Sequence, residues 1–220
     1  MAKIVESQVH KNITSSTSSQ SILLEEYRAL HGDYIQQRSE GITRMNFFIT
    51  ALSVVLGGVL IFASKTNATT FPYFSLVLLA ALLILATIGL DVDSFLIQRN
   101  IDIDRDIRGM ARVRNYFVNL DPGLKIFLVN DIYDTPTDHL VVKGSGMRRS
   151  AEIIVGFLIG IALTVLSTYF PLALEINIMI GVSVTILTAL FLEFSAQRKL
   201  GKALRDAQKE MKLNINVTEK

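Results

Sequence analysis

The sequence contains no cysteine, which excludes three kinds of chemistry at once. A chain without thiols forms no disulfide framework, no thiolate metal site and no cysteine nucleophile. The first 20 residues also lack the apolar core of a cleavable signal peptide, and Thr14 to Ser21 is rich in serine and threonine. We therefore expect insertion into a membrane to depend on an internal helix that is not removed.

Charge is missing from four long stretches of the chain. Half of the residues are hydrophobic, and the mean hydropathy of +0.40 is one that water-soluble proteins seldom have. The first two stretches are long enough to cross a hydrocarbon core of roughly 30 Å as helices that rise about 1.5 Å per residue, and the last two are near the short end of the usual range of roughly 17 to 25 residues. The stretches cover residues 45–63, 71–90, 153–170 and 176–192.

These stretches predict an all-α, polytopic membrane protein with four transmembrane helices, arranged as two hairpins with cytoplasmic helical extensions. The connections within the hairpins, at residues 64–70 and 171–175, are short. Helices buried inside a large soluble protein are the alternative, but four such blocks in 220 residues leave too little chain to cover them.

Lysine and arginine are distributed very unevenly around the four stretches. Five precede the first, nine lie between the second and third, and seven follow the fourth, whereas Lys65 alone lies in a hairpin turn. The positive-inside rule therefore predicts a multi-pass membrane protein with both termini and the 91–150 loop in the cytoplasm. The predicted segments are a disordered N-terminus (1–20), a cytoplasmic helix (21–44), transmembrane hairpin 1 (45–90), a cytoplasmic helical loop (91–149), transmembrane hairpin 2 (150–194) and a basic cytoplasmic C-terminal helix or tail (195–220).

Two polar segments carry apolar stripes at helical spacing. The first is predicted to begin at Ser21 as a helix N-cap, and the second to end at the turn Asp121-Pro122-Gly123. Both stripes are expected to pack on each other or on a neighbouring subunit, with the membrane surface as the alternative. The candidate docking residues are Tyr27, Leu30, Tyr34, Ile103, Ile107, Met110 and Phe117. Beyond this turn, residues 124–133 could be helix or strand, and a brief strand is expected at 139–143.

Small residues recur every four positions in the third and fourth stretches. Such stripes allow close helix packing, and the first pair is a Gly-x-x-x-Gly motif. The sequence leaves open whether they pack within one four-helix unit or between subunits of an oligomer. The stripe residues are Gly156, Gly160, Thr164 and Thr168, followed by Gly181, Thr185 and Ala189.

No catalytic or cofactor-binding pattern is apparent. Asp102, Asp104 and Asp106 suggest a calcium loop, but the glycine and glutamate that an EF-hand needs are missing, so a solvated helix face with local ion pairs is expected. Glu152, Glu175 and Glu193 are expected to be hydrated at the ends of the spans. We therefore predict a protein that is not an enzyme and that has no metal or cofactor.

The centres of the four stretches carry no ionisable residue. This argues against an ion-coupled transporter with a site inside one subunit. A pore assembled from several copies needs no charge, because backbone, hydroxyl groups or an apolar constriction can line it. Such a pore therefore stays open as a function.

Two segments carry a resemblance to known proteins. Residues 24–30 (LEEYRAL) and 112–118 (RVRNYFV) resemble segments of small uncharacterised bacterial membrane proteins with four transmembrane helices. At greater distance, this group includes membrane effectors and partner subunits of antiphage defence systems. The resemblance implies a bacterial inner-membrane protein that works as an oligomer with a cytosolic partner or trigger, and it transfers no functional residue.

The expected partners are the lipid bilayer, further copies of the chain and a soluble cytoplasmic protein, with no specific nucleic acid. The leading hypothesis is an oligomeric, channel-like or effector protein whose cytoplasmic helices sense a signal or dock the partner, with altered membrane permeability as the output. The alternative is a structural or scaffold subunit of a larger membrane complex.

Overall fold

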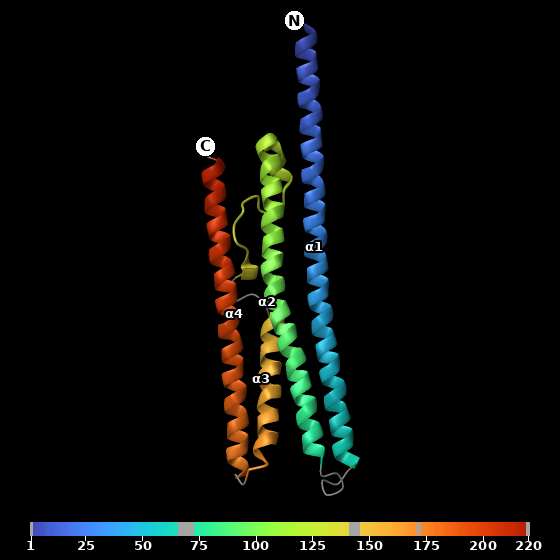
Figure 1. Cartoon of the computed structure of the whole chain (residues 1–220), viewed down its shortest axis with the longest axis vertical. Coiled ribbons are helices and arrows are strands. Elements are labelled where there is room, and N and C mark those ends of the chain that lie inside the picture. The colour runs from blue at the N-terminus through green and yellow to red at the C-terminus, as the bar shows by residue number, and fades with distance from the viewer. Residues whose placement is uncertain (1, 66–72, 141–145, 171–172, 219–220) are drawn as a thin grey trace. The chain divides into compact units, whose positions relative to one another are not determined.

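The computed structural model describes the backbone of residues 2–65, 73–140, 146–170 and 173–218, and side chains within 19–212 except positions 63 and 65 and the gaps. Over these residues the chain is helical and forms no strand, which confirms the predicted all-α class (Figure 1). Four of the helices are long and apolar enough to cross a membrane. The elements are α1 (Ala2–Lys65), α2 (Phe74–Leu120), α3 (Gly146–Ser167) and α4 (Leu174–Thr218), with the short 3₁₀ helices η1 (Pro122–Phe127) and η2 (Asp138–Leu140).

The first helix begins earlier than the sequence analysis predicts. Because α1 runs without interruption from Ala2, Ser21 lies inside a helix and is not an N-cap, and residues 2–20 are helical rather than irregular. The physical reason is that this segment contains neither glycine nor proline, so nothing in it breaks the helical hydrogen-bonding pattern.

The loop after α2 begins where the sequence predicts. Helix α2 ends at Leu120, and the Asp121 carboxylate accepts a hydrogen bond of 2.9 Å from the backbone N–H of Gly123, which starts η1. The strand expected at 139–143 is wrong where the chain is described, because residues 138–140 form η2 and residues 141–145 lie outside the description. A strand needs a neighbouring strand to accept and donate its backbone hydrogen bonds, and the described residues form helices and no second strand. Of the predicted hairpin turns, residues 66–70 and 171–172 lie in the two other gaps, whereas α1 extends to Lys65 and α4 begins at Leu174.

The chain divides into two compact units. Unit 1 comprises residues 1–38, 102–137 and 206–220, and unit 2 comprises residues 39–101 and 138–205.

Unit 2 contains the main apolar core. Phe48 of α1 is fully buried, and Leu82 and Leu158, from α2 and α3, are each 1% exposed. Gly89 keeps α2 close to its neighbours, because an added Cβ there would lie 2.8 Å from the Phe48 ring. The buried members of this core are Met45, Phe48, Leu82, Leu85, Ala86, Val92, Leu96, Ala151, Val155, Leu158, Ala162 and Leu192.

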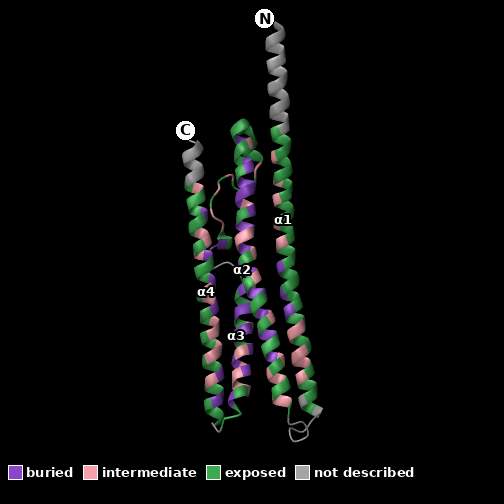
Figure 2. Ribbon diagram, in the orientation of Figure 1, coloured by how far each residue is buried: buried purple, intermediate pink, exposed green. Residues whose placement is uncertain are grey.

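The outside of unit 2 is also apolar. Large side chains with more than half of their surface exposed recur along its helices, and Figure 2 shows exposed residues alternating with intermediate and buried ones on α4. A contiguous apolar exterior is unfavourable in water and suits hydrocarbon. Examples are Phe47, Leu60, Ile84, Phe157, Met179, Leu187 and Phe191.

Candidate functional site

The predicted docking stripes of α1 and α2 lie together in unit 1. An added Cβ at Gly109 of α2 would lie 2.9 Å from Leu30 of α1, so the two helices approach closely at this point. The Arg114 guanidinium lies 5.7 Å from the centroid of the Tyr27 ring, a favourable cation–π distance. Ile103 and Met110 are buried, whereas Tyr27, Leu30, Tyr34, Ile107 and Phe117 are partly buried. Much of the stripe surface is therefore occupied within the chain.

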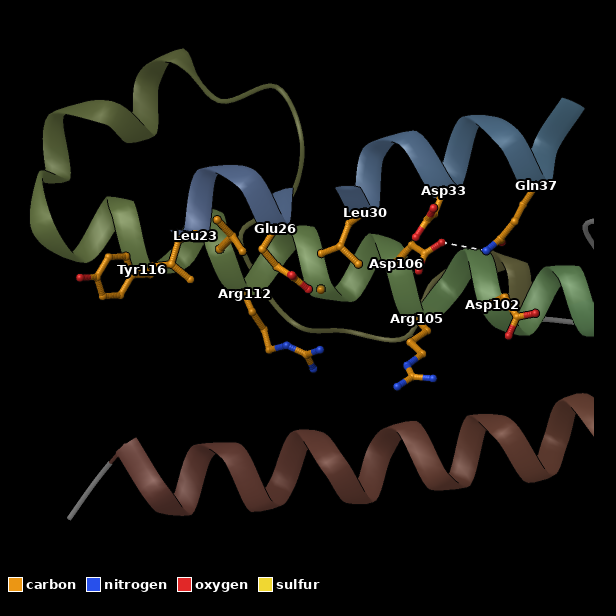
Figure 3. A pocket seen from close by; sticks show the side chains of 12 residues that line it. Leu23, Glu26, Leu30, Asp33, Gln37, Asp102, Arg105, Asp106, Arg112 and Tyr116 are labelled. Carbon is orange, nitrogen blue, oxygen red and sulfur yellow. Dashed lines mark hydrogen bonds between the residues drawn. The ribbon is translucent and has the colours of Figure 1, made fainter. Parts of the chain in front are cut away.

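A groove of about 560 Å³ runs between these two helix segments. Its apolar lining includes Leu30 and Val113, but charged residues dominate its polar lining (Figure 3). Figure 3 shows the carboxylates of Asp33 and Asp106 pointing toward each other from α1 and α2, whereas Arg105 points away from α1. The charged lining residues are the acids Glu26, Asp33, Asp102 and Asp106 and the bases Arg105 and Arg112.

Asp106 forms the buried part of this acidic lining. It is 8% exposed and accepts a hydrogen bond of 3.1 Å from the Gln37 side-chain amide. Burial, and then the negative charges of Asp33 and Asp102, raise the pKa of the Asp106 carboxyl above its ordinary value of 3.8. Arg105 and the Gln37 hydrogen bond oppose these effects. The groove therefore keeps a surplus of acidic groups close together.

The predicted solvated face of Asp102, Asp104 and Asp106 is wrong for the last two. Asp104 is 1% exposed and forms a buried ion pair with Arg108, with 2.8 Å between the Asp104 Oδ2 and Arg108 Nε atoms. Its other carboxylate oxygen accepts bonds of 2.7 and 2.9 Å from the backbone and hydroxyl of Thr137. The local ion pair follows from the spacing of four residues, but the loop that buries it cannot be read from that spacing.

Arg108 joins three parts of unit 1. Besides Asp104, its guanidinium lies 3.5 Å from an Asp134 oxygen in the loop and 3.2 Å from a Glu210 oxygen on α4. A buried arginine with several acidic partners fixes the positions of the segments that supply them. Within the described chain, no group of three histidine, aspartate or glutamate side chains is arranged to hold a metal ion.

A second buried ionic group lies in unit 2. Arg148 and Glu152, one turn apart on α3, are each 2% exposed and hydrogen-bonded to each other. The Arg148 Nη2 atom lies 3.2 Å from an oxygen of Glu193 on α4, and Asp93 of α2 is also buried. The prediction that Glu152 is hydrated at the membrane surface is wrong, because Arg148 pairs with it inside the helix packing. Glu175 is exposed.

The small-residue stripes face each other within one chain. An added Cβ at Gly156 would lie 2.9 Å from the carbonyl oxygen of Thr185, and Ala189 also contacts this position. The hydroxyls of Thr164 and Thr185 donate to the carbonyls of Gly160 and Gly181, one turn earlier in their own helices. These contacts correspond to packing within the four-helix unit, the first of the two alternatives left open by the sequence. Thr168 lies beyond the end of α3 and is exposed.

Neither buried ionic group was predicted from the sequence, where Glu152 and Glu193 were expected to be hydrated. Arg148 and Glu152 carry the signal of a spacing of four residues, whereas Asp93 and Glu193 come from other helices and carry no such signal. Comparison of the chain with protein-family models, curated proteins and solved structures gave no match. Its function therefore has to be inferred from its own residues.

Proposed function

We propose that this chain is a homo-oligomeric, multi-pass protein of a bacterial inner membrane. In this proposal, unit 1 lies in the cytoplasm and docks a soluble protein or receives a signal, and the assembled spans alter membrane permeability. The observation that carries the proposal is the contrast between the two surfaces: unit 2 exposes bulky apolar side chains, whereas unit 1 has a charged groove. Hydrocarbon suits the first surface and a water-soluble partner suits the second.

The orientation rests on the distribution of lysine and arginine. Of the 22 such residues, Lys65 alone lies at the connection between two paired spans, at the end of α1. An imbalance of this size favours retention of both termini and of the 91–150 loop in the cytoplasm. The four uncharged stretches then cross the bilayer as two hairpins.

The exposed face of α4 supports assembly from several copies. Its small residues are already packed against α3, so another copy would have to contact the bulky side chains on the rest of the helix. Met179, Val182 and Leu187 are each more than half exposed there. A pore formed between copies could be lined by such apolar groups and by hydroxyls, without a charged residue.

The charge of the groove indicates the kind of protein that would dock. Four acidic residues line it against two arginines, and one of these, Arg112, already pairs with Asp134 at 3.1 Å. Lysine or arginine side chains on a soluble partner would complement the remaining negative charge. Such complementarity increases the rate at which the two proteins associate and the specificity of their complex. The distant resemblance to membrane subunits of antiphage defence systems supports a triggered effector of this type.

A scaffold subunit is the second candidate, and the ionic network of Arg108 favours it. The network joins α2, the loop and α4 through three acidic partners, as expected for a rigid attachment point. A scaffold would dock a partner without changing the permeability of the bilayer. The two functions therefore differ in one measurable property.

Permeability can be measured with the full chain in liposomes that contain a self-quenched dye. We expect dye release above that of protein-free liposomes, increasing steeply with the protein-to-lipid ratio because several copies form each pore. If no dye is released at any ratio, even with the docked partner present, permeabilisation is excluded and the scaffold function is favoured.

Docking can be tested by placing a photo-crosslinking amino acid at Asp33, inside the groove, or at Glu25, an exposed position that does not line it. We expect one defined soluble protein to be crosslinked from position 33 in living cells and not from position 25. The charge reversal Asp33→Lys should abolish its co-purification, whereas Glu25→Lys should not. Equal crosslinking from both positions would contradict docking in the groove.

A further inference from the structure

Four ionisable side chains from three helices lie near one another inside unit 2: three of them are in contact, and Asp93 lies within range of their charges. They are Asp93 of α2, Arg148 and Glu152 of α3, and Glu193 of α4. Asp93 is 3% exposed, and Arg148 and Glu152 are each 2% exposed. All four flank the uncharged stretches rather than interrupt them. We refer to these residues as the Arg148 cluster.

The Arg148 cluster contains three carboxyl groups and one guanidinium. Arg148 bonds to Glu152 and to Glu193, so two carboxylates already share its single positive charge. A further base, Lys199, is exposed and acts on Asp93 through its positive charge. On α1, Arg44 pairs instead with Asp91. With every carboxyl ionised, the interior would hold an excess of negative charge, which a medium of low dielectric strongly disfavours.

Two contacts indicate where a proton would relieve this excess. Glu152 and Glu193 both bond to the guanidinium of Arg148, through its Nη1 and Nη2 atoms, so the two carboxyl groups lie at the same cation. A hydrogen bond between two carboxyl groups requires that one of them carry a proton, and such a pair titrates as a unit. Glu193 is the partner better able to stay ionised, because the amide of Gln197 donates to it at 3.1 Å.

Asp93 gives an independent indication. Its Oδ1 atom is buried and has no hydrogen-bond partner in the described structure. An ionised carboxylate ordinarily attracts several donors, so an oxygen left without one disfavours the charged form. The cluster thus lacks the donors and the positive charge that three ionised carboxyls would need.

We propose that the Arg148 cluster is a buried proton-binding site, in which a proton is held between Glu152 and Glu193 at neutral pH. The bound proton allows α3 and α4 to pack together with α2 beside them. Its release would leave like charges facing each other in the interior and would push α4 away from α3. This site does not depend on the docking of a partner or on pore formation.

Infrared spectroscopy of the full chain in lipid tests the site directly, because protonated carboxyl groups have a carbonyl stretching band separate from that of carboxylates. We expect this band at neutral pH and its loss on alkaline titration. Glu152→Gln should remove it while keeping a hydrogen-bond donor toward Glu193, and Glu193→Gln provides a second variant if the first folds poorly. The exposed Glu175→Gln serves as the matched control and should retain the band.

The movement can be measured separately, because the chain has no cysteine of its own. Spin labels on Arg149→Cys and Arg198→Cys, both exposed, report the separation of α3 and α4. We expect this distance to increase at alkaline pH in the parent chain and to stay constant in Glu152→Gln. The absence of a protonated-carboxyl band at neutral pH, or its persistence in both glutamine variants, would overturn the proposal.

Discussion

A Cβ atom built on Gly160 would lie 2.6 Å from the carbonyl oxygen of Gly181. Helices α3 and α4 therefore meet backbone to backbone at this point, closer than any residue with a side chain allows. The reverse relationship also holds, since a Cβ on Gly181 would lie 3.1 Å from the Gly160 carbonyl oxygen. The packing of this hairpin depends on two glycines at matching heights.

The first prediction concerns Gly160→Ala. The added methyl group meets backbone atoms that cannot rotate away, so the helices must separate, and we expect a loss of roughly 1–3 kcal/mol of stability. Unfolding of the detergent-solubilised protein by heat or by SDS measures this. The matched control is Gly57→Ala, where an added Cβ has nothing within 4 Å. An equal loss in both variants would show that the close contact is not the cause.

A second prediction compares two adjacent arginines. Arg148→Met removes a buried positive charge and leaves the carboxyls of Glu152 and Glu193 without their shared partner, so we expect a loss on the order of 3–5 kcal/mol. Arg149→Met removes an exposed arginine of the same size and should change stability little. The same unfolding measurement applies. Similar behaviour of the two variants would disprove the importance of the ionic group.

A third prediction follows from the raised pKa of Asp106. Folding tightens proton binding at this carboxyl, so its contribution to stability is present at low pH and is lost as the pH rises from about 4 through the folded pKa. Asp106→Asn removes the ionisation while its side-chain oxygen still accepts from Gln37. We therefore expect the variant to be more stable than the parent at neutral pH, with a difference that shrinks on acidification.

The measurement for Asp106 is the midpoint of thermal unfolding of both proteins at several pH values. The exposed Glu25→Gln controls for general effects of a lost carboxylate. A stability difference that is constant across the pH range would contradict the assignment to Asp106.

A fourth prediction tests the orientation in the membrane. Because the chain has no cysteine, a single Ser64→Cys or Arg149→Cys substitution gives a unique labelling site. A membrane-impermeant maleimide should label position 64 in intact cells, after the outer membrane is made permeable, and should label position 149 only after lysis. Labelling of position 149 in intact cells would contradict cytoplasmic retention of the loop.

Local patterns in the sequence predicted much of the helical architecture. The uncharged stretches, the end of α2 before Asp121 and the stripes of glycine and threonine depend on neighbours within a turn or two along the chain. The start of α1 was predicted at the wrong residue because Ser21, although a good N-cap residue, can also lie inside a helix that begins earlier in the chain. Likewise, the strand at residues 139–143 was inferred from composition without a partner strand.

The candidate sites were predictable only in part. The spacing of Arg148 and Glu152, and of Asp104 and Arg108, favours ion pairs on one helix face. The surroundings of these pairs come from residues that are far away in the sequence. Asp93 and Glu193 lie near Arg148 and Glu152, whereas Thr137 and Glu210 bond to Asp104 and Arg108. In the folded protein, an ion pair of the kind common on helix surfaces becomes part of a buried group that has more carboxyl groups than positive charges.

The sequence by itself determined that the chain is helical and has four segments suited to hydrocarbon, because helix length and missing charge are properties of contiguous residues. It also determined the asymmetry of basic residues on which the orientation rests. Only the tertiary structure decided that the small-residue stripes are used within one chain and that carboxyl groups from separate helices meet around Arg148. Charge balance and close packing depend on which residues become neighbours in space. Short segments of the sequence do not show which distant residues these will be.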